Sequence, residues 1–290
     1  MKTILYATDY SDNSIAALQL AHAFSKKLKS KLLVLHVFDL SVTIASTVSL
    51  SYARKKAKTI KEHKERLSSF CEGHLGVQTD NSNISLKVVE GAPAWESIID
   101  SVNKFKVDLI VVGKKGESAI KEALLGSTTT ALIEKADCPV LAVPESLSQK
   151  EINTMVYTTD LEEADLKAIE NLVGIAKEFK ASINVVHIST KNEYAGEEQM
   201  EWFKEMLHQK INFDKLQFNL LFSEDVFNAL LEYIREVDPN MIVMLERQGH
   251  SLIKSIWHRD IVKRMLTESD FPLLTFHKKN LKLNKEHTVS

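Results

Sequence analysis

Glycine, lysine and hydroxyl residues gather after one apolar run, and their spacing suits the binding of a phosphate group. The run ends at Gly113, and the residues that follow are Lys114, Lys115 and Gly116, then Gly126, Ser127, Thr128 and Thr129. Glycine adopts positive φ at no steric cost, so we expect Gly113 and Gly116 to turn the backbone close to a ligand. We expect Gly126 to open a helix whose free N–H groups hold a phosphate, with the two lysines adding charge at the rim.

Such a loop needs a buried sheet to hold it, and the hydrophobic pattern predicts one. Apolar runs at 3–7, 31–37, 84–89, 107–112 and 139–143 alternate with segments of helical periodicity. Strands separated by helices of this length pair in parallel through right-handed crossovers, which gives a doubly wound α/β sheet. Ligands of such sheets sit at the carboxyl ends of the strands, where the winding direction reverses.

The chain contains this pattern twice. The segment that begins at Thr3 aligns without a gap on the segment that begins at Thr154, and five pairs are identical: Tyr6/Tyr157, Thr8/Thr159, Asp9/Asp160, Val34/Val185 and His36/His187. A repeat of about 150 residues is a duplicated domain rather than a solenoid unit. We therefore expect a first domain at 1–146, a second at 151–279, and a tail at 280–290.

The string from Leu109 to Val143 runs strand, GxxG, KEALLGS, helix and CPVLAV. In this order it resembles the nucleotide-binding loop of the universal stress protein family, in the subgroup that binds ATP. The resemblance implies an adenine nucleotide α-hydrolase-like fold with a five-stranded parallel sheet of order 3-2-1-4-5 in each domain. It also implies that the two domains pair through their last strands, PVLAV and PLLTF, as an intramolecular pseudo-dimer, with a further homodimer left open.

The resemblance places further residues around an ATP or AMP molecule. Residues that match Ala7, Thr8 and Asp9 line the adenosine pocket in this family, and the backbone at the position of Val37 meets the edge of the adenine. Asp9 has two readings that can hold together: it accepts from a ribose hydroxyl or helps to hold Mg²⁺ or Mn²⁺, and it caps the helix that follows. For His36 and His187 we favour a bond from the imidazole to a neighbouring backbone group over a catalytic role.

The second copy departs from the pattern at the loop. Leu245 replaces Gly113, and Arg259 and Asp260 stand where Gly126 and Ser127 stand in the first copy. We expect Asp260 to lie at a helix N-terminus and to satisfy the N–H groups that a phosphate would otherwise use. The sequence therefore predicts one nucleotide per chain, in the first domain.

These observations favour a tandem universal stress protein with a nucleotide-responsive regulatory or stress-survival role, and at most slow ATP hydrolysis. One alternative is an enzyme of the adenine nucleotide α-hydrolase-like class, but the SGGxDS and HxGH motifs of such enzymes are replaced by ATDYSD. Another is an interaction module with a vestigial loop. The Walker A motif and the spacings typical of hydrolytic triads and of zinc sites do not occur in the sequence.

Composition narrows the class of partner. Charged residues make up 26% of the chain and the formal net charge is −2, so no basic surface for nucleic acid is expected. The apolar run at the N-terminus is too short for a signal peptide or a membrane span. With Cys71 and Cys138 far apart and outside any metal-binding spacing, we expect a cytoplasmic protein with ordinary thiols and no membrane contact.

Overall fold

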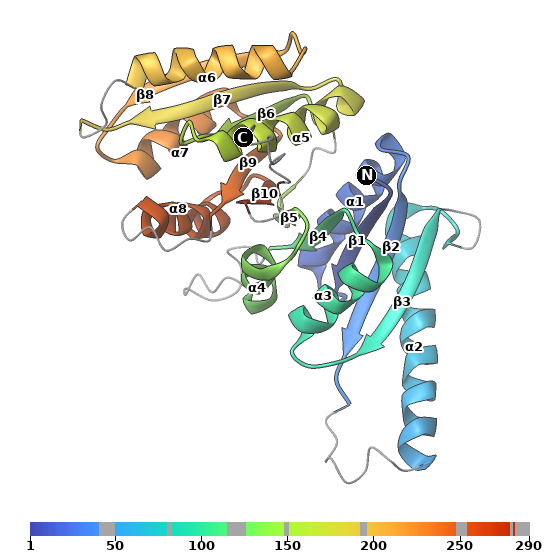
Figure 1. Cartoon of the computed structure of the whole chain (residues 1–290). Helices are drawn as coiled ribbons and strands as arrows, with labels where there is room; N and C mark the ends of the chain where they lie inside the picture. The colour runs from blue at the N-terminus through green and yellow to red at the C-terminus, as the bar shows by residue number, and fades with distance from the viewer. Residues whose placement is uncertain are drawn as a thin grey trace, which may run out of the picture. The chain divides into compact units, whose positions relative to one another are not determined.

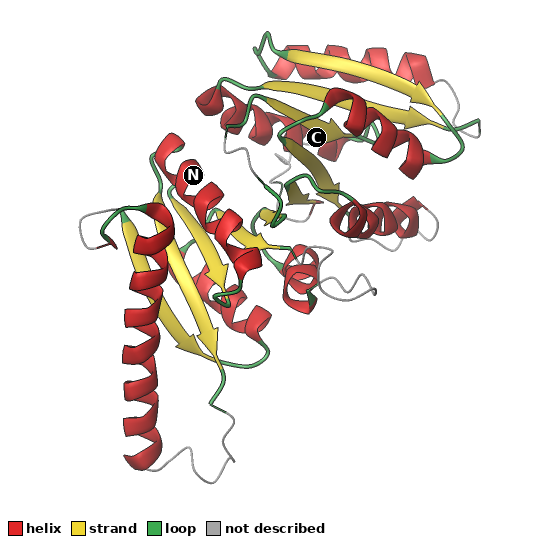
Figure 2. Cartoon of the chain, turned by 180° about the vertical axis from the view of Figure 1, so that it is seen from behind, coloured by secondary structure: helices red, strands yellow, loops and turns green. Residues whose placement is uncertain are grey.

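The computed structural model describes residues 1–40, 50–79, 83–114, 126–147, 151–191, 196–247, 254–278 and 281, with the backbone alone for 254–260. The chain divides into two compact units, Met1–Lys150 and Glu151–Ser290 (Figure 1). Each unit is an α/β sheet with helices on both faces (Figure 2). None of the helices in the described part of the chain has the length and apolar character needed to cross a membrane.

The first unit alternates strands and helices as its sequence pattern predicts. Its elements are β1 (Thr3–Thr8), the 3₁₀ turn η1 (Asp12–Ser14), α1 (Ile15–Lys27), β2 (Lys31–Phe38), α2 (Leu50–Leu75), β3 (Ile84–Glu90), α3 (Ala94–Phe105), β4 (Leu109–Gly113), α4 (Ser127–Lys135) and β5 (Val140–Val143). The strands lie in the order β3-β2-β1-β4-β5, and every adjacent pair is parallel.

The second unit has the same arrangement. Its elements are β6 (Thr154–Thr158), α5 (Glu163–Phe179), β7 (Ser182–Ser189), α6 (Gly196–Lys210), β8 (Leu216–Phe222), α7 (Val226–Val237), β9 (Met241–Glu246), α8 (Lys254–Glu268) and β10 (Leu273–His277). The order β8-β7-β6-β9-β10, again parallel throughout, is the same 3-2-1-4-5 order counted within the unit. The fold class predicted from the sequence is confirmed for both copies.

The central strands are apolar because helices cover both of their faces. In the first unit α1 and α2 contact each other against one face, and α3 and α4 do so against the other. Ile4, Leu5 and Tyr6 of β1 are completely buried, as are Leu109, Ile110 and Val111 of β4. Burial of a large apolar side chain contributes about 1.5 to 3 kcal/mol, so these strands form a rigid base for the groups at their ends.

The switch in winding direction lies between β1 and β4. Strand β1 pairs with β2 on one side, where Ala7 is opposite Leu35, and with β4 on the other, where Ala7 is opposite Val112. The three carboxyl ends therefore meet at one edge of the sheet, which is the place where sheets of this class bind ligands.

Candidate functional site

A cavity of about 550 Å³ opens at this edge of the first unit. Its volume lies within the range of roughly 300 to 1,000 Å³ that is usual for small-molecule sites. Every described residue that the sequence predicted for the site lines it: Ala7, Thr8, Asp9, Val37, Gly113, Lys114, Gly126, Ser127, Thr128 and Thr129. Lys115 and Gly116 lie outside the described residues. The structure thus brings together groups from β1, β2, β4 and α4, and the first and last of these residues, Ala7 and Thr129, are about 120 positions apart in the chain.

One end of the cavity is apolar. Leu35 and Val37 of β2 face it together with Ala94 and Ile98 of α3. An apolar slot between a strand and a helix suits a flat ring, because such a ring is buried without loss of hydrogen bonds on its faces. Leu35, Ala94 and Ile98 were not predicted from the sequence, although Leu35 pairs with Ala7 and its position follows from the strand register.

The other end is polar and is made by the start of α4. Gly126 is the N-cap residue of this helix and has no side chain to bond the N–H groups of the first turn. These N–H groups lie where Ser127, Thr128 and Thr129 line the cavity, and the helix dipole favours an anion there. The buried Lys114, which is 3% exposed, also lines the cavity and adds a positive charge. This end is suited to phosphate.

Gly113 is required for a reason other than the one the sequence suggested. The prediction of a positive φ at this residue is wrong, since it is the last residue of β4 and Gly76 is the one glycine with positive φ among the described residues. A Cβ atom at Gly113 would lie 2.5 Å from the backbone oxygen of Asn13. Glycine here allows η1 to pack against the end of β4, which positions Asn13 and Ser14 beside the cavity.

Asp9 shapes the turn after β1 and does not cap the helix that follows. Its Oδ1 accepts from the N–H of Ser11 at 3.0 Å and from the Ser11 hydroxyl at 2.6 Å. The side chains at the starts of η1 and α1 make no capping bond, so the predicted capping role is wrong. Because Asp9 is exposed and lines the cavity, its carboxylate remains accessible to a ligand hydroxyl.

Thr8 and His36 hold the end of β1 in place. The Thr8 hydroxyl shares a hydrogen bond with the Ser14 hydroxyl at 2.9 Å and accepts from the N–H of Tyr10. His36 Nδ1 lies 2.8 Å from the carbonyl oxygen of Thr8, and since a carbonyl only accepts, Nδ1 carries the proton. His187 makes the equivalent bond to Thr159 in the second unit. The prediction that these histidines bond to backbone is confirmed.

His36 also belongs to an aromatic cluster beneath α2. Its ring centroid lies 4.2 Å from that of Tyr10 and 4.5 Å from that of His63, and Arg66 lies over the Tyr10 ring. Burial lowers the pKa of His36, and the adjacent His63 and Arg66 lower it further, although the Thr8 carbonyl acts in the opposite direction. Burial, followed by the charge of Arg66, also lowers the pKa of His63.

We expect the first unit to lose stability as the pH falls below about 6.5, the pKa of histidine in an unfolded chain. A histidine with a lowered folded-state pKa stabilises the fold fully above that value, and the contribution is lost as pH falls towards the folded pKa. Asp9 and Glu62 partly offset the effect because their charges raise the two pKa values. Urea unfolding at pH 7.5 and 5.5 is the measurement, and His63→Gln should reduce the pH-dependent loss of stability.

His208→Gln, which removes an exposed histidine of the second unit, is the matched control for the loss of an imidazole. An identical pH dependence in the parent chain and in His63→Gln would show that the cluster does not titrate in this range.

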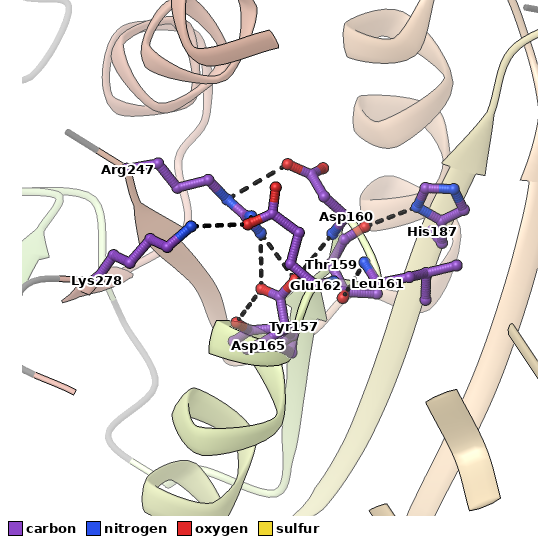
Figure 3. Close-up of polar contacts among 9 residues, drawn as sticks. All are labelled: Tyr157, Thr159, Asp160, Leu161, Glu162, Asp165, His187, Arg247 and Lys278. Carbon is purple, nitrogen blue, oxygen red and sulfur yellow. Dashed lines mark hydrogen bonds and ion pairs between the residues drawn. The ribbon is translucent and has the colours of Figure 1, made fainter. Parts of the chain in front are cut away.

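The second unit has an arginine at the equivalent edge (Figure 3). The Nη2 atom of Arg247 donates to both carboxylate oxygens of Asp165 at 2.8 Å, Nε lies 3.3 Å from Asp160, and Nη1 is paired with Glu162. Arg247 is 6% exposed and Asp165 is completely buried. Burial lowers the pKa of Arg247, but the three carboxylates more than reverse this and raise it above its ordinary value, so the residue stays charged.

The partners of Arg247 correspond to residues that line the cavity of the first unit. In the gap-free alignment of the two copies, Asp160, Glu162 and Asp165 correspond to Asp9, Ser11 and Ser14, all of which line the cavity of the first unit. The guanidinium of Arg247 is therefore bonded to the counterparts of three cavity-lining residues. Sequence reasoning missed this arginine. The one sign of it in the sequence was that the second copy has Asp165 where the first copy has Ser14, because a carboxylate at a buried position needs a cation nearby.

The reasons predicted for the loss of the second site need correction. Leu245 is the counterpart of Gly113, since each lies two residues beyond the residue that pairs with the shared tyrosine, and it is completely buried in β9. However, α8 begins at Lys254, so Asp260 lies within the helix and the prediction that it occupies a helix N-terminus is wrong. The side chains of Arg259 and Asp260 lie outside the described residues.

Comparison with known proteins gives the family. The model of the universal stress protein family matches residues 1–144. A universal stress protein of Methanocaldococcus jannaschii is 31% identical over 144 residues, which make up 49% of this chain and 81% of that protein. The chain belongs to the universal stress protein family. In both of these matches, only about half of this universal stress protein is aligned, and the family model covers its first unit.

Other matches extend over both copies of this universal stress protein. A universal stress protein of Synechocystis is 23% identical over 293 residues, which cover 95% of this chain and all of the relative. The crystal structure of a universal stress protein from Archaeoglobus fulgidus has a TM-score of 0.72 at 17% identity, and covers 95% of this chain and 98% of that one. At this identity the likeness shows the fold alone, and the chemistry of the site depends on the residues described above.

Proposed function

We propose that this universal stress protein binds one adenine nucleotide, ATP or AMP, in the cavity of its first unit. The observation that carries the proposal is the order of the groups along the cavity. Among the residues that line the cavity, Val37 lies near the end of β2, Asp9 follows β1 and Lys114 follows β4, and these strands are adjacent in the order β2-β1-β4. Base, ribose and phosphate follow one another in the same order in a nucleotide.

The phosphate end binds through the backbone N–H groups of the first turn of α4 and through Lys114. A divalent ion such as Mg²⁺ or Mn²⁺ would be carried mainly by the phosphates. In the described part of the chain no three potential ligand residues of the His, Cys, Asp or Glu type are placed to hold a metal. The function proposed is therefore binding of the nucleotide rather than rapid hydrolysis. The state of the protein with a nucleotide in the cavity would differ from the empty state in its regulatory or stress-survival role.

One nucleotide per chain follows from the contrast between the units. At the edge where the first unit has the Asp9 carboxylate free to meet a ribose hydroxyl, the second has the Asp160 carboxylate paired with Arg247. Arg247 is itself held by Asp165, so it is not free to turn towards a phosphate. The buried Leu245 adds bulk where the first unit has glycine.

Calorimetric titration of the full chain with ATP and with AMP, each with and without Mg²⁺, tests the proposal. We expect a stoichiometry near one per chain, unchanged in an Asp260→Ala variant. Mass spectrometry of the ligand released from the purified, denatured protein should show an adenine nucleotide. A stoichiometry near two would contradict the account of the second unit, and no heat with either nucleotide, together with no released nucleotide, would contradict the account of the first.

A further inference from the structure

A second cavity lies in the second unit, at the carboxyl ends of β7 and β8, and nothing above assigns a role to it. Its volume is about 430 Å³. It is bounded by the end of β7, the start of α6 and the turn that follows β8. It is lined by a different set of residues from the Arg247 cluster, which lies at the ends of β6 and β9. Cavities at the carboxyl edge of a parallel sheet are common ligand sites.

The Ser189 hydroxyl is the polar group at the base of this cavity. The residue is 3% exposed, and within the described part of the chain its hydroxyl makes no hydrogen bond. A Cβ atom added to Gly196 would lie 2.7 Å from Ser189 Oγ, so the hydroxyl packs against this glycine at the start of α6, and both residues line the cavity. Ser189 Oγ therefore keeps its hydrogen-bonding capacity for a ligand in the cavity.

The start of α6 supplies donors beside this hydroxyl. The helix runs for 15 residues from Gly196, and the N–H groups of its first turn have no partner within the helix. Its dipole places partial positive charge at the same point, and Lys191 lies on the wall of the cavity. A carboxylate or another oxyanion fits this end, between the helix start and Ser189.

The mouth of the cavity has the opposite charge. Glu197, Glu198 and Glu224 are exposed there, and Glu224 is held in place because its Oε1 accepts from the N–H of Lys191 at 2.7 Å. Three carboxylates against one lysine leave a net charge of −2. Such a mouth repels a simple anion such as phosphate, so the ligand must also carry a positive group.

The last part of the wall is apolar. Phe222, at the end of β8, is 66% exposed and is one of only four large hydrophobic residues that are exposed in the described part of the chain. Its ring lines the cavity next to Glu224. An exposed aromatic ring beside carboxylates binds the apolar body of an amine-bearing ligand well.

We propose that this cavity binds a small zwitterion of the amino-acid type. The carboxylate of the ligand lies at the start of α6 and accepts from the Ser189 hydroxyl. Its ammonium group lies among the three glutamates at the mouth, and its side chain packs on Phe222. The second unit, which has no place for a nucleotide, is then a receptor for a different metabolite.

Nuclear magnetic resonance of the full chain with each standard amino acid at millimolar concentration is the first test. We expect at least one amino acid to shift the amide signals of Gly196 and Phe222. For the best of them, the matched compounds that lack either the ammonium or the carboxylate group should bind at least about tenfold more weakly. No shift at these amides with any amino acid overturns the proposal, as does equal binding of either matched compound.

Variants separate the two ends of the site. Ser189→Ala should weaken binding at least about tenfold. Glu224→Gln, which keeps an acceptor for the Lys191 N–H, should remove most of the preference for the amino acid over the compound without the ammonium group. Glu232→Gln, on the exposed face of α7, is the matched control and should bind as the parent does. Undiminished binding in Ser189→Ala, with the same thermal stability as the parent, would show that the hydroxyl is not part of a site.

Discussion

Replacement of Gly126 by aspartate is expected to abolish nucleotide binding in the first unit and to leave the fold intact. The fold should accept the side chain because a Cβ atom at this position has Thr129 Oγ1 as its nearest neighbour, at 3.7 Å. Gly126 has φ −57°, which any residue adopts without strain. Aspartate is also a preferred N-cap residue, so α4 should be as stable as before or more stable.

The same aspartate acts against the ligand in two ways. Its carboxylate bonds the N–H groups of the first turn of α4 that a phosphate would otherwise use, and it places a negative charge within about 4 Å of the phosphate, which costs on the order of 4 kcal/mol at an effective dielectric constant of 20. We therefore expect at least about a hundredfold loss of affinity for ATP in calorimetric titration.

Gly126→Asn is the matched control for this prediction. Asparagine has nearly the same volume and also caps helices, but it carries no charge. It should therefore weaken binding much less than aspartate. Unchanged affinity in Gly126→Asp would place the phosphate elsewhere, and equal losses in both variants would attribute the effect to bulk rather than to charge.

Replacement of Arg247 by methionine is expected to destabilise the second unit by about 3 to 5 kcal/mol. The change removes the cation from a completely buried Asp165, whose remaining partners are the Tyr157 hydroxyl and the N–H groups of Asp160 and Glu162. A buried carboxylate that loses its cation is left uncompensated, whereas an ion pair removed as a whole is often replaced at little cost. Hydrogen exchange of the amides in β6 should report the loss, because this strand is at the centre of the second unit.

A second substitution tests whether the loss of stability comes from the unpaired carboxylate of Asp165. Adding Asp165→Ser to Arg247→Met copies the residue that the first unit has at the same position, Ser14, and removes the stranded carboxylate. We expect the double variant to recover at least half of the free energy of unfolding that Arg247→Met loses. The effects of the two substitutions are then not additive, as is usual for two groups in contact. Lys278→Ala is the control, since its pair with Glu162 is largely exposed and should be worth less than about 1 kcal/mol. Similar losses for Lys278→Ala and Arg247→Met would refute the special role of the buried arginine.

Most of the fold could be predicted from the sequence because it depends on local patterns. Continuous apolar runs such as 107–112 have to be buried on both faces, and alternation with helices leaves parallel pairing as the solution. The gap-free repeat from Thr3 and Thr154 then assigns the same architecture to both halves. The candidate site was predicted for the same reason, since it is built mainly from backbone and glycine at strand and helix ends, whose positions follow from where the elements begin and end.

The parts that could not be predicted depend on side chains that meet only after folding. Gly113 was expected to provide a positive φ, but its actual constraint is the Asn13 oxygen at 2.5 Å, which comes from a segment about a hundred residues earlier in the chain. Asp9 was expected to cap a helix, but it bonds the turn residue Ser11 because η1 intervenes before α1. The position of Arg247 itself gave no signal, since a charged residue after a strand is usually solvated, and the one indirect sign was Asp165 at the position of Ser14. Only the tertiary structure shows that it is enclosed by Asp160, Glu162 and Asp165, because a buried charge is stable only where the fold assembles its partners around it.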